Sequence, residues 1–146
     1  MATQDQFVDP SRTLFEAFKA LPRDEPVLML NLLRFKAKAT YPSDHALASE
    51  GLSGAEAYGH YGTDSGPIFK RVGGEIVFRG DFRTMVIGPE DEHWDAMFVA
   101  RYPTASAFLE MVTDPDYRVA VVHRQSAVET SRLIRMAESG LGGTFS

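Results

Sequence analysis

The chain has 146 residues, the usual size of one domain, and 44% of them are hydrophobic, enough to bury one sizeable core. Lys and Arg total 15 against 20 Asp and Glu, and this net charge of -5 argues against nucleic acid or an anionic membrane as partner. The absence of cysteine excludes disulfides, thiolate nucleophiles, Cys-ligated zinc and iron–sulfur clusters. Residues 1–9 lack a signal-peptide pattern and no apolar run reaches membrane-spanning length, so we expect a cytoplasmic protein.

The first third of the chain predicts a helix, a strand and a long loop. Asp9–Pro10 is typical of a helix start, with the aspartate as the N-cap and the proline in the first helical position. The dense apolar run Val27–Phe35 predicts a strand, with Asn31 as its interior polar residue. Residues 36–52 show no period and predict a loop, and loops of this length in small domains are often functional.

The middle of the chain predicts a second helix followed by a strand. Ser53 and Glu56 form a capping-box pattern that opens the helix, and we expect residues 62–67 to interrupt it. The alternation over Glu75–Gly80 predicts a strand with Ile76 and Phe78 on one face.

The last part of the chain predicts two strands and two helical segments. Residues 82–87 are expected to continue the preceding strand past a bend, and Trp94–Tyr102 to form the third strand. A helix is predicted from about Thr104, with a restart and a new cap at Asp114–Pro115. Thr130–Met136 is predicted as the last strand.

From Val27 onward the predicted order is strand, helix, strand, strand, helix, strand. Two such β-α-β halves predict an α+β, ferredoxin-like βαββαβ sandwich, with a four-stranded antiparallel sheet and both helices on one face. We expect one domain over residues 1–146, with a core of about 27–136, a helical extension over 1–26 and a flexible tail over 137–146. Because the strands are apolar on both faces, we expect a second copy to cover the bare face in a homodimer.

An ordered set of short motifs is distributed along this predicted core: Met29–Phe35, Tyr58 with Tyr61, Gly73–Gly74, Trp94–Asp95, Tyr102–Pro103, Ala107–Phe108 with Met111, Asp114–Tyr117, Arg124 and Ser131–Ile134. Together they resemble the domain-of-unknown-function family thirteen-thirty, over about residues 27–136. The resemblance implies the dimeric α/β barrel superfamily, with its ferredoxin-like fold and homodimer. It implies no reaction, because that superfamily includes cofactor-free monooxygenases, lactone isomerases, haem-binding enzymes and proteins with no known activity.

Five polar residues are candidates for a site. An unpaired Asn31 amide would cost about 1–3 kcal/mol in an apolar strand, so it must bond to backbone, to the dimer partner or to a ligand. Arg34 and Arg79 lie near strand ends, where a guanidinium can bind a carboxylate or phenolate ligand or form a structural ion pair. Tyr58 and Tyr61 could act in catalysis by donating to a developing oxyanion, or could be core residues with solvated hydroxyls.

Other polar residues have more ordinary interpretations. His60 is expected in solvent, since it cannot share the face of its two flanking tyrosines. Arg124 is expected to pair with an acidic residue at the sheet. Residues 90–95 contain metal-ligand types, but their spacing favours a solvated turn, so no metal site is predicted.

The sequence leaves open whether the protein is an enzyme. It contains no nucleophile elbow, phosphate-binding glycine loop or dinucleotide fingerprint. The first hypothesis is a small-molecule-binding protein without cofactor, a cofactor-independent isomerase or monooxygenase acting on an aromatic or polyketide-like anion. One alternative is a non-catalytic dimeric binding or structural protein. A second is a haem-binding protein, with His60 and His123 as candidate axial ligands.

Overall fold

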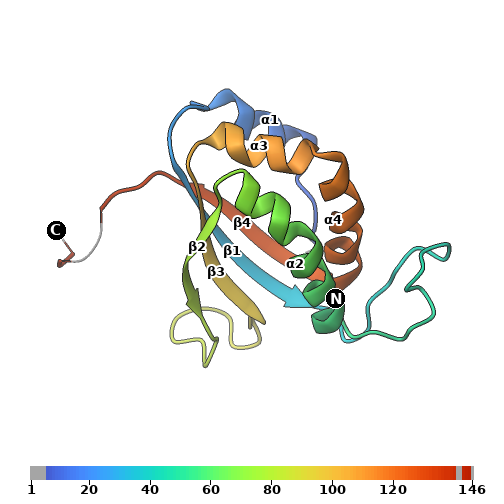
Figure 1. Ribbon diagram of the computed structural model, residues 1–146. Coiled ribbons are helices and arrows are strands. Elements are labelled where there is room, and N and C mark those ends of the chain that lie inside the picture. The colour runs from blue at the N-terminus through green and yellow to red at the C-terminus, as the bar shows by residue number, and fades with distance from the viewer. Residues whose placement is uncertain (1–5, 141–142, 146) are drawn as a thin grey trace.

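The chain folds as two β-α-β halves that share one sheet. A computed structural model describes residues 6–140 and 143–145 (Figure 1). The elements, in chain order, are α1 (Arg12–Ala20), β1 (Val27–Phe35), α2 (Gly54–Arg71), β2 (Glu75–Gly80), β3 (Ala96–Tyr102), α3 (Ala105–Thr113), α4 (Pro115–Ala127) and β4 (Val128–Met136). The strand order is β2-β3-β1-β4 with every neighbouring pair antiparallel, which is the ferredoxin-like topology. The predicted fold class is therefore confirmed.

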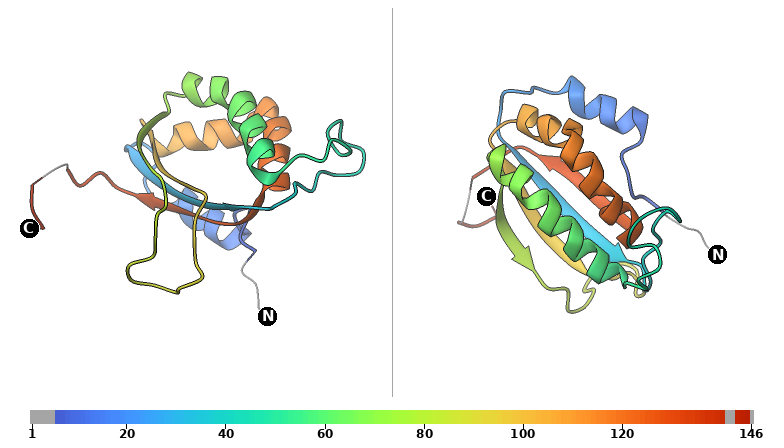
Figure 2. Two further views of the ribbon diagram at one scale, coloured as in Figure 1. Left: turned by 90° about the horizontal axis from the view of Figure 1, so that it is seen from below. Right: turned by 45° about the vertical axis from the view of Figure 1, so that its right-hand side comes forward.

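The helices α2, α3 and α4 cover one face of the sheet, while the connection between β2 and β3 extends from the opposite side (Figure 2). α1 lies along the β4 edge beside α3 (Figure 1), with the rings of Phe18 and Phe108 5.1 Å apart. Arg135 of β4 holds this helix by donating to the carbonyl oxygens of Phe18 and Pro22. None of the described helices is long and apolar enough to cross a membrane.

Local capping signals decide where three of the helices begin. The Ser53 hydroxyl accepts from the Glu56 amide, and the Glu56 carboxylate accepts from the Ser53 amide, so the predicted capping box is confirmed. Asp114 caps α4 as predicted, and Thr104, the approximate predicted start of α3, is the cap of that helix. In each case a nearby side-chain oxygen accepts a hydrogen bond from a backbone amide that has no partner within the helix. These helix starts therefore do not depend on residues far away in the chain.

The predicted start of the first helix is wrong by two residues. Ser11 is the N-cap of α1, and its hydroxyl accepts from the Leu14 amide. Asp9 instead accepts from the side-chain amide of Gln125 on α4, so a long-range partner takes the carboxylate away from the helix end.

The predicted interruption of α2 is also wrong, because the helix continues through residues 62–67 and ends only at Arg71. Pro67 lies inside the helix, where it removes the hydrogen bond to the Thr63 carbonyl four residues earlier. Both residues are exposed, so water can satisfy that carbonyl, and packing against α4 and the sheet supports the helix on either side.

β2 differs from its prediction in two ways. A register shift between Ile76 and Phe78 pairs them with Ala100 and Val99, so they lie on opposite faces rather than one. Residues 82–87 do not continue the strand, since β2 ends at Gly80 and β3 begins at Ala96. The predicted tail forms no helix or strand in its described residues 137–140 and 143–145, and residues 141, 142 and 146 lie outside the described residues.

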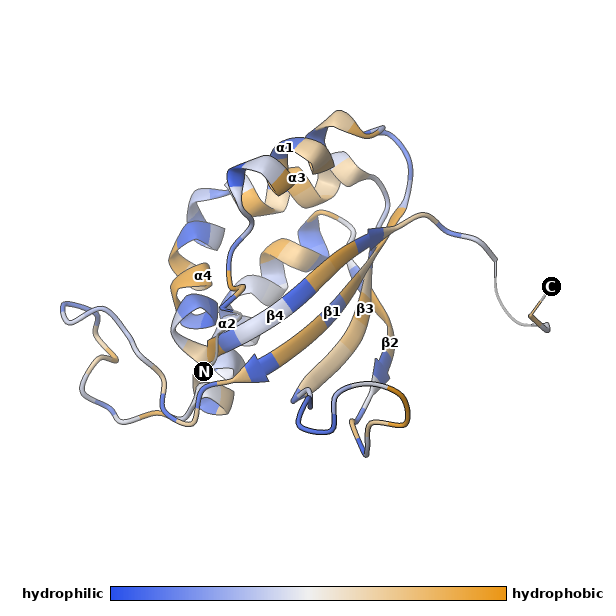
Figure 3. Cartoon of the chain, turned by 180° about the vertical axis from the view of Figure 1, so that it is seen from behind, coloured by the Kyte–Doolittle hydropathy of each residue, from blue (hydrophilic) through white to orange (hydrophobic). Residues whose placement is uncertain are grey.

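The strands β1 and β3 consist mainly of hydrophobic residues (Figure 3), and some of these lie on the sheet face opposite α2 and α4. Strand alternation and the register place on it Leu28, Leu30, Leu32, Phe78, Met97, Val99, Ile134 and Met136. Phe78 is 64% exposed and Ile134 46% exposed, so this open face presents a bare hydrophobic surface.

Candidate functional site

A polar seam divides the hydrophobic core on the helix-covered face of the sheet. Val27 and Met29 belong to one buried cluster and Leu33 to a second one. Asn31 lies between them in β1 with its side chain on the same face, because alternate strand residues share a face. Its neighbour in β3, Phe98, packs against both clusters. The polar seam is therefore the region around Asn31, between the two buried clusters and between the sheet and the helices.

Asn31 is half-buried, and its Nδ2 donates to the carbonyl oxygen of Met29 in the same strand at 3.1 Å. This backbone bond is one of the partners expected from the sequence. A side-chain amide has two donor hydrogens and a carbonyl acceptor, so one such bond leaves capacity for a ligand.

Four tyrosines line the seam, three from the helices and one from the sheet. The hydroxyls of Tyr61 on α2 and Tyr117 on α4 are 2.8 Å apart, and the rings of Tyr58 and Tyr61 are 5.3 Å apart. Tyr102 of β3 contributes the fourth phenol, which donates to the sulfur of Met111. Burial raises the pKa of the Tyr58, Tyr102 and Tyr117 hydroxyls, and the neighbouring Tyr61 adds to each rise. These three phenols are therefore neutral hydrogen-bond donors at physiological pH.

The arginines are divided between the two faces. The register pairs Arg79 with Phe98, which places it on the seam side, and its charge opposes the rise in the Tyr58 pKa. Arg124 of α4 acts on Tyr58 in the same way, but its guanidinium donates to the Val8 carbonyl and the Ser131 hydroxyl rather than to the expected acidic residue.

Arg34 is three residues from Asn31 and so lies on the opposite face of β1. It donates to the carbonyl oxygens of Asp91 and His93 at 3.4 Å each. Of the five candidate residues, the structure brings Asn31, Tyr58, Tyr61 and Arg79 to the seam and leaves Arg34 outside it.

Sequence reasoning missed a second polar cluster, which joins α2, α4 and the loop over residues 36–52. The Tyr41 hydroxyl lies 2.6 Å from Nδ1 of His123, and Nε2 of His123 lies 3.1 Å from the Asp64 carboxylate. The rings of His45 and His60 flank His123 at 5.5 Å and 5.3 Å. The signals for it were the long loop over residues 36–52 and the polar residues of α2, but nothing in the sequence pairs them.

Two remaining hypotheses can be compared with the structure. Both ring nitrogens of His123 are engaged, so the imidazole as placed offers no lone pair to a haem iron. In the segment 90–95, Asp95 accepts from the Phe35 amide and thereby ends β1. Within residues 6–140 and 143–145, no three side chains of metal-ligand type lie close enough together to hold a metal ion.

The fold and seam define an α+β, ferredoxin-like protein with a polar, tyrosine-lined layer between its sheet and helices. The chain belongs to the family described as Domain of unknown function (DUF1330), whose sequence profile matches residues 45–137. That match begins after β1, whereas the resemblance noted from the sequence starts at about residue 27. No curated protein is significantly similar to the chain.

The chain is similar to the RPA0582 protein of Rhodopseudomonas palustris, a protein of unknown function for which two crystal structures match. One is 50% identical, with a TM-score of 0.85 over 92% of this chain and 98% of that one. The other, of the methylated protein, is 48% identical, with a TM-score of 0.88 over 96% of this chain and 100% of that one. SnoaB, a cofactor-independent oxygenase from Streptomyces nogalater, is 13% identical with a TM-score of 0.49 over 80% and 96% of the two chains. A likeness at that level says nothing about activity.

Proposed function

We propose that the protein binds a small aromatic or polyketide-like anion in the polar seam and acts on it as a cofactor-independent isomerase or monooxygenase. The observation that supports this proposal is the set of neutral phenols next to cationic guanidiniums. Burial raises the pKa of Tyr58 and Tyr117, while Arg79 and Arg124 act on the Tyr58 hydroxyl with their positive charges. Such a site favours the deprotonated form of an enol or phenol ligand.

Each seam residue has a role in this proposal. Asn31 and Arg79 orient the ligand, and Tyr58 and Tyr61 donate hydrogen bonds to its oxyanion. The Tyr61 hydroxyl bonds to Tyr117, which holds it in position. Stabilising the anion makes the bound molecule reactive toward a proton or oxygen, so the protein needs no cofactor of its own.

A non-catalytic binding protein is the second candidate. It is favoured by the chemistry of the seam, because burial raises the pKa of Tyr58 and Tyr117, so these phenols keep their protons at neutral pH and do not act as general bases. Hydrogen–deuterium exchange of acetylacetone in D2O, followed by NMR, separates the two candidates. Exchange that is faster with protein, and slower again with Tyr61→Phe, supports the enzyme, whereas an unchanged rate supports the binding protein.

Ligand binding itself can be tested with 4-nitrophenolate, a coloured aromatic anion. We expect Arg79→Ala to weaken binding about tenfold, the value of one charge-assisted hydrogen bond. Arg34→Ala is the matched control, since Arg34 lies on the opposite face of the sheet. Equal binding by the wild type and Arg79→Ala would remove Arg79 from the site, and loss of binding with Arg34→Ala would move the ligand to the other face.

We also propose that the protein is a homodimer whose copies cover each other's open face. The support is that face's apolar surface, with Phe78 and Ile134 partly exposed on it, together with Val86 and Ile87, which are about nine-tenths exposed in the β2–β3 connection. Light scattering at micromolar concentration should return twice the chain mass of 16.2 kDa. A mass near 16.2 kDa across a dilution series contradicts the dimer. A cytoplasmic location stays a prediction.

A further inference from the structure

The second polar cluster has the geometry of an activated nucleophile. A carboxylate only accepts hydrogen bonds, so Nε2 of His123 must donate to Asp64. In a neutral imidazole the other nitrogen is then an acceptor, and the Tyr41 hydroxyl donates to Nδ1 across 2.6 Å. A hydroxyl, a base and a carboxylate that orients the base are thereby in line.

Backbone hydrogen bonds hold Tyr41 in this position. The amide of Thr40, the preceding residue, donates to the Ser126 carbonyl at the end of α4 at 3.0 Å. The Ala39 amide donates to the Leu52 carbonyl, which closes the base of the loop over residues 36–52. The loop therefore fixes the phenol against α4, the same helix that carries His123.

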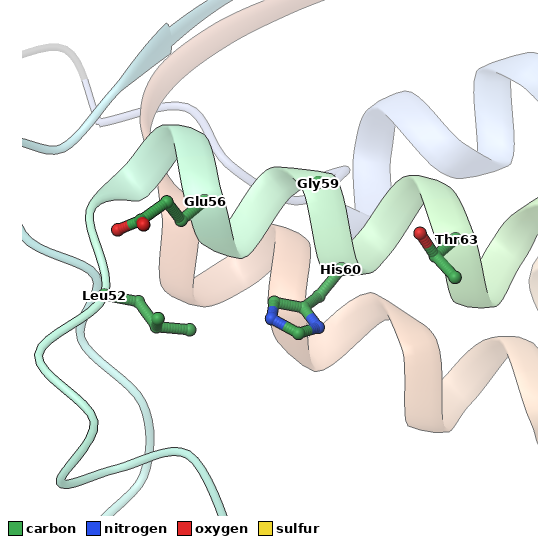
Figure 4. A pocket seen from close by; sticks show the side chains of 5 residues that line it. All are labelled: Leu52, Glu56, Gly59, His60 and Thr63. Carbon is green, nitrogen blue, oxygen red and sulfur yellow. The ribbon is translucent and has the colours of Figure 1, made fainter.

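A hollow of about 400 Å³ lies on α2, and His60 of the second polar cluster is part of its lining (Figure 4). Its lining includes Leu52, Glu56, His60 and Thr63. The ring of His60 stacks on that of His123 with centroids 5.3 Å apart, so His60 connects the hollow to the hydrogen-bonded chain. The charged group of the lining is the Glu56 carboxylate, which suits a ligand with a protonated amine.

We propose that Tyr41, His123 and Asp64 form a nucleophile–base–carboxylate site that accepts acyl groups from a small ester carrying a protonated amine, held in the hollow by Glu56. This site is separate from the seam and does not depend on the proposed function.

In the proposed reaction, the protons move between Tyr41, His123 and the reacting molecules. The Tyr41 oxygen forms a bond to the acyl carbon, the bond from that carbon to the leaving alkoxide breaks, and the phenolic proton passes to Nδ1 of His123. The imidazolium is stabilised by Asp64 through Nε2. The imidazolium then gives this proton to the leaving alkoxide. The neutral imidazole next takes a proton from a water molecule as the water oxygen attacks the acyl carbon, and it returns that proton to the Tyr41 oxygen as the carboxylic acid is released.

The electrostatics agree with a step of this kind. Burial, with a further contribution from Asp64, raises the pKa of Tyr41, so the phenol keeps its proton until His123 removes it. Burial also lowers the pKa of His123, helped by His60 and His45 and opposed by Asp64, so the resting imidazole is neutral and able to accept.

Acetylation by 4-nitrophenyl acetate tests the nucleophile. Mass spectrometry of peptides should find acetyl on Tyr41 in the wild type, at a rate that falls about tenfold or more in Asp64→Asn and His123→Gln. Asp64→Asn matters most, because it keeps the size of an exposed side chain while allowing the opposite imidazole tautomer. His93→Gln is the matched control, a histidine outside the cluster, and should react like the wild type. Melting curves show whether each variant is folded.

An unmodified Tyr41 in the wild type, or equal Tyr41 acetylation in the wild type and a folded Asp64→Asn, would overturn the proposal. The ligand class is tested by the ratio of rates for glycine 4-nitrophenyl ester and 4-nitrophenyl acetate. Glu56→Gln keeps the capping box but removes the charge, and we expect it to lower that ratio about tenfold. An unchanged ratio rejects the protonated amine as the feature that the hollow recognises.

Discussion

Replacing Asn31 by Leu separates a ligand-binding role from a structural one. The side chain is half-buried, and its Nδ2 bonds to the Met29 carbonyl two residues earlier in the same strand. Losing that bond costs about 1 kcal/mol net. A half-buried Leu recovers about 1 kcal/mol by covering apolar surface between the two core clusters. The free energy of unfolding should therefore change by less than about 1 kcal/mol.

For a domain of this size, 1 kcal/mol corresponds to roughly 3–4 °C in melting temperature. We expect thermal melts of Asn31→Leu to stay within that range, and binding of 4-nitrophenolate to weaken by about 1–3 kcal/mol through the lost hydrogen bond. Asn31→Ala removes the amide without adding apolar surface, so it should weaken binding equally and be the less stable of the two variants. A loss above about 2 kcal/mol in Asn31→Leu, with unaltered binding, would refute the seam assignment and make Asn31 a structural residue.

Three further outcomes follow from single contacts. Tyr61→Phe removes the partner of the Tyr117 hydroxyl at 2.8 Å and should lower the free energy of unfolding by about 1 kcal/mol in urea titrations; no change would mean that water replaces the bond. Gly54→Ala brings a Cβ to 2.2 Å from the Lys36 carbonyl, so we expect a loss of about 3 kcal/mol or more, and a variant as stable as the wild type contradicts this close approach. His123 has a lowered pKa in the folded protein, so the unfolded chain binds more protons; its contribution to stability is complete above the ordinary histidine pKa of 6.5 and is lost as pH falls below it. Urea titrations between pH 7.5 and about 5.5 should show a weaker pH dependence in His123→Gln, and equal dependence would refute the assignment.

Local chemistry explains what could be predicted from the sequence. The capping box of Ser53 and Glu56 and the Asp114 cap act within three residues, so their patterns are sufficient to start α2 and α4. The run Val27–Phe35 similarly specifies a strand, since seven of its nine residues are apolar and are stabilised by removal from water. The order of these elements, with the rule that short connections join neighbours, leads to the ferredoxin-like topology.

The rest was decided by contacts between residues far apart in the chain. The bulge that separates Ile76 from Phe78 depends on pairing with β3, and Pro67 is tolerated because neighbouring elements hold α2 on both sides. Tyr41 and His123 are separated by 82 residues and meet only because the loop and α4 are placed side by side. The residue types of both candidate sites can be read from the sequence, but which face a side chain occupies and which distant group it meets are properties of packing, and packing exists only once the tertiary structure has formed.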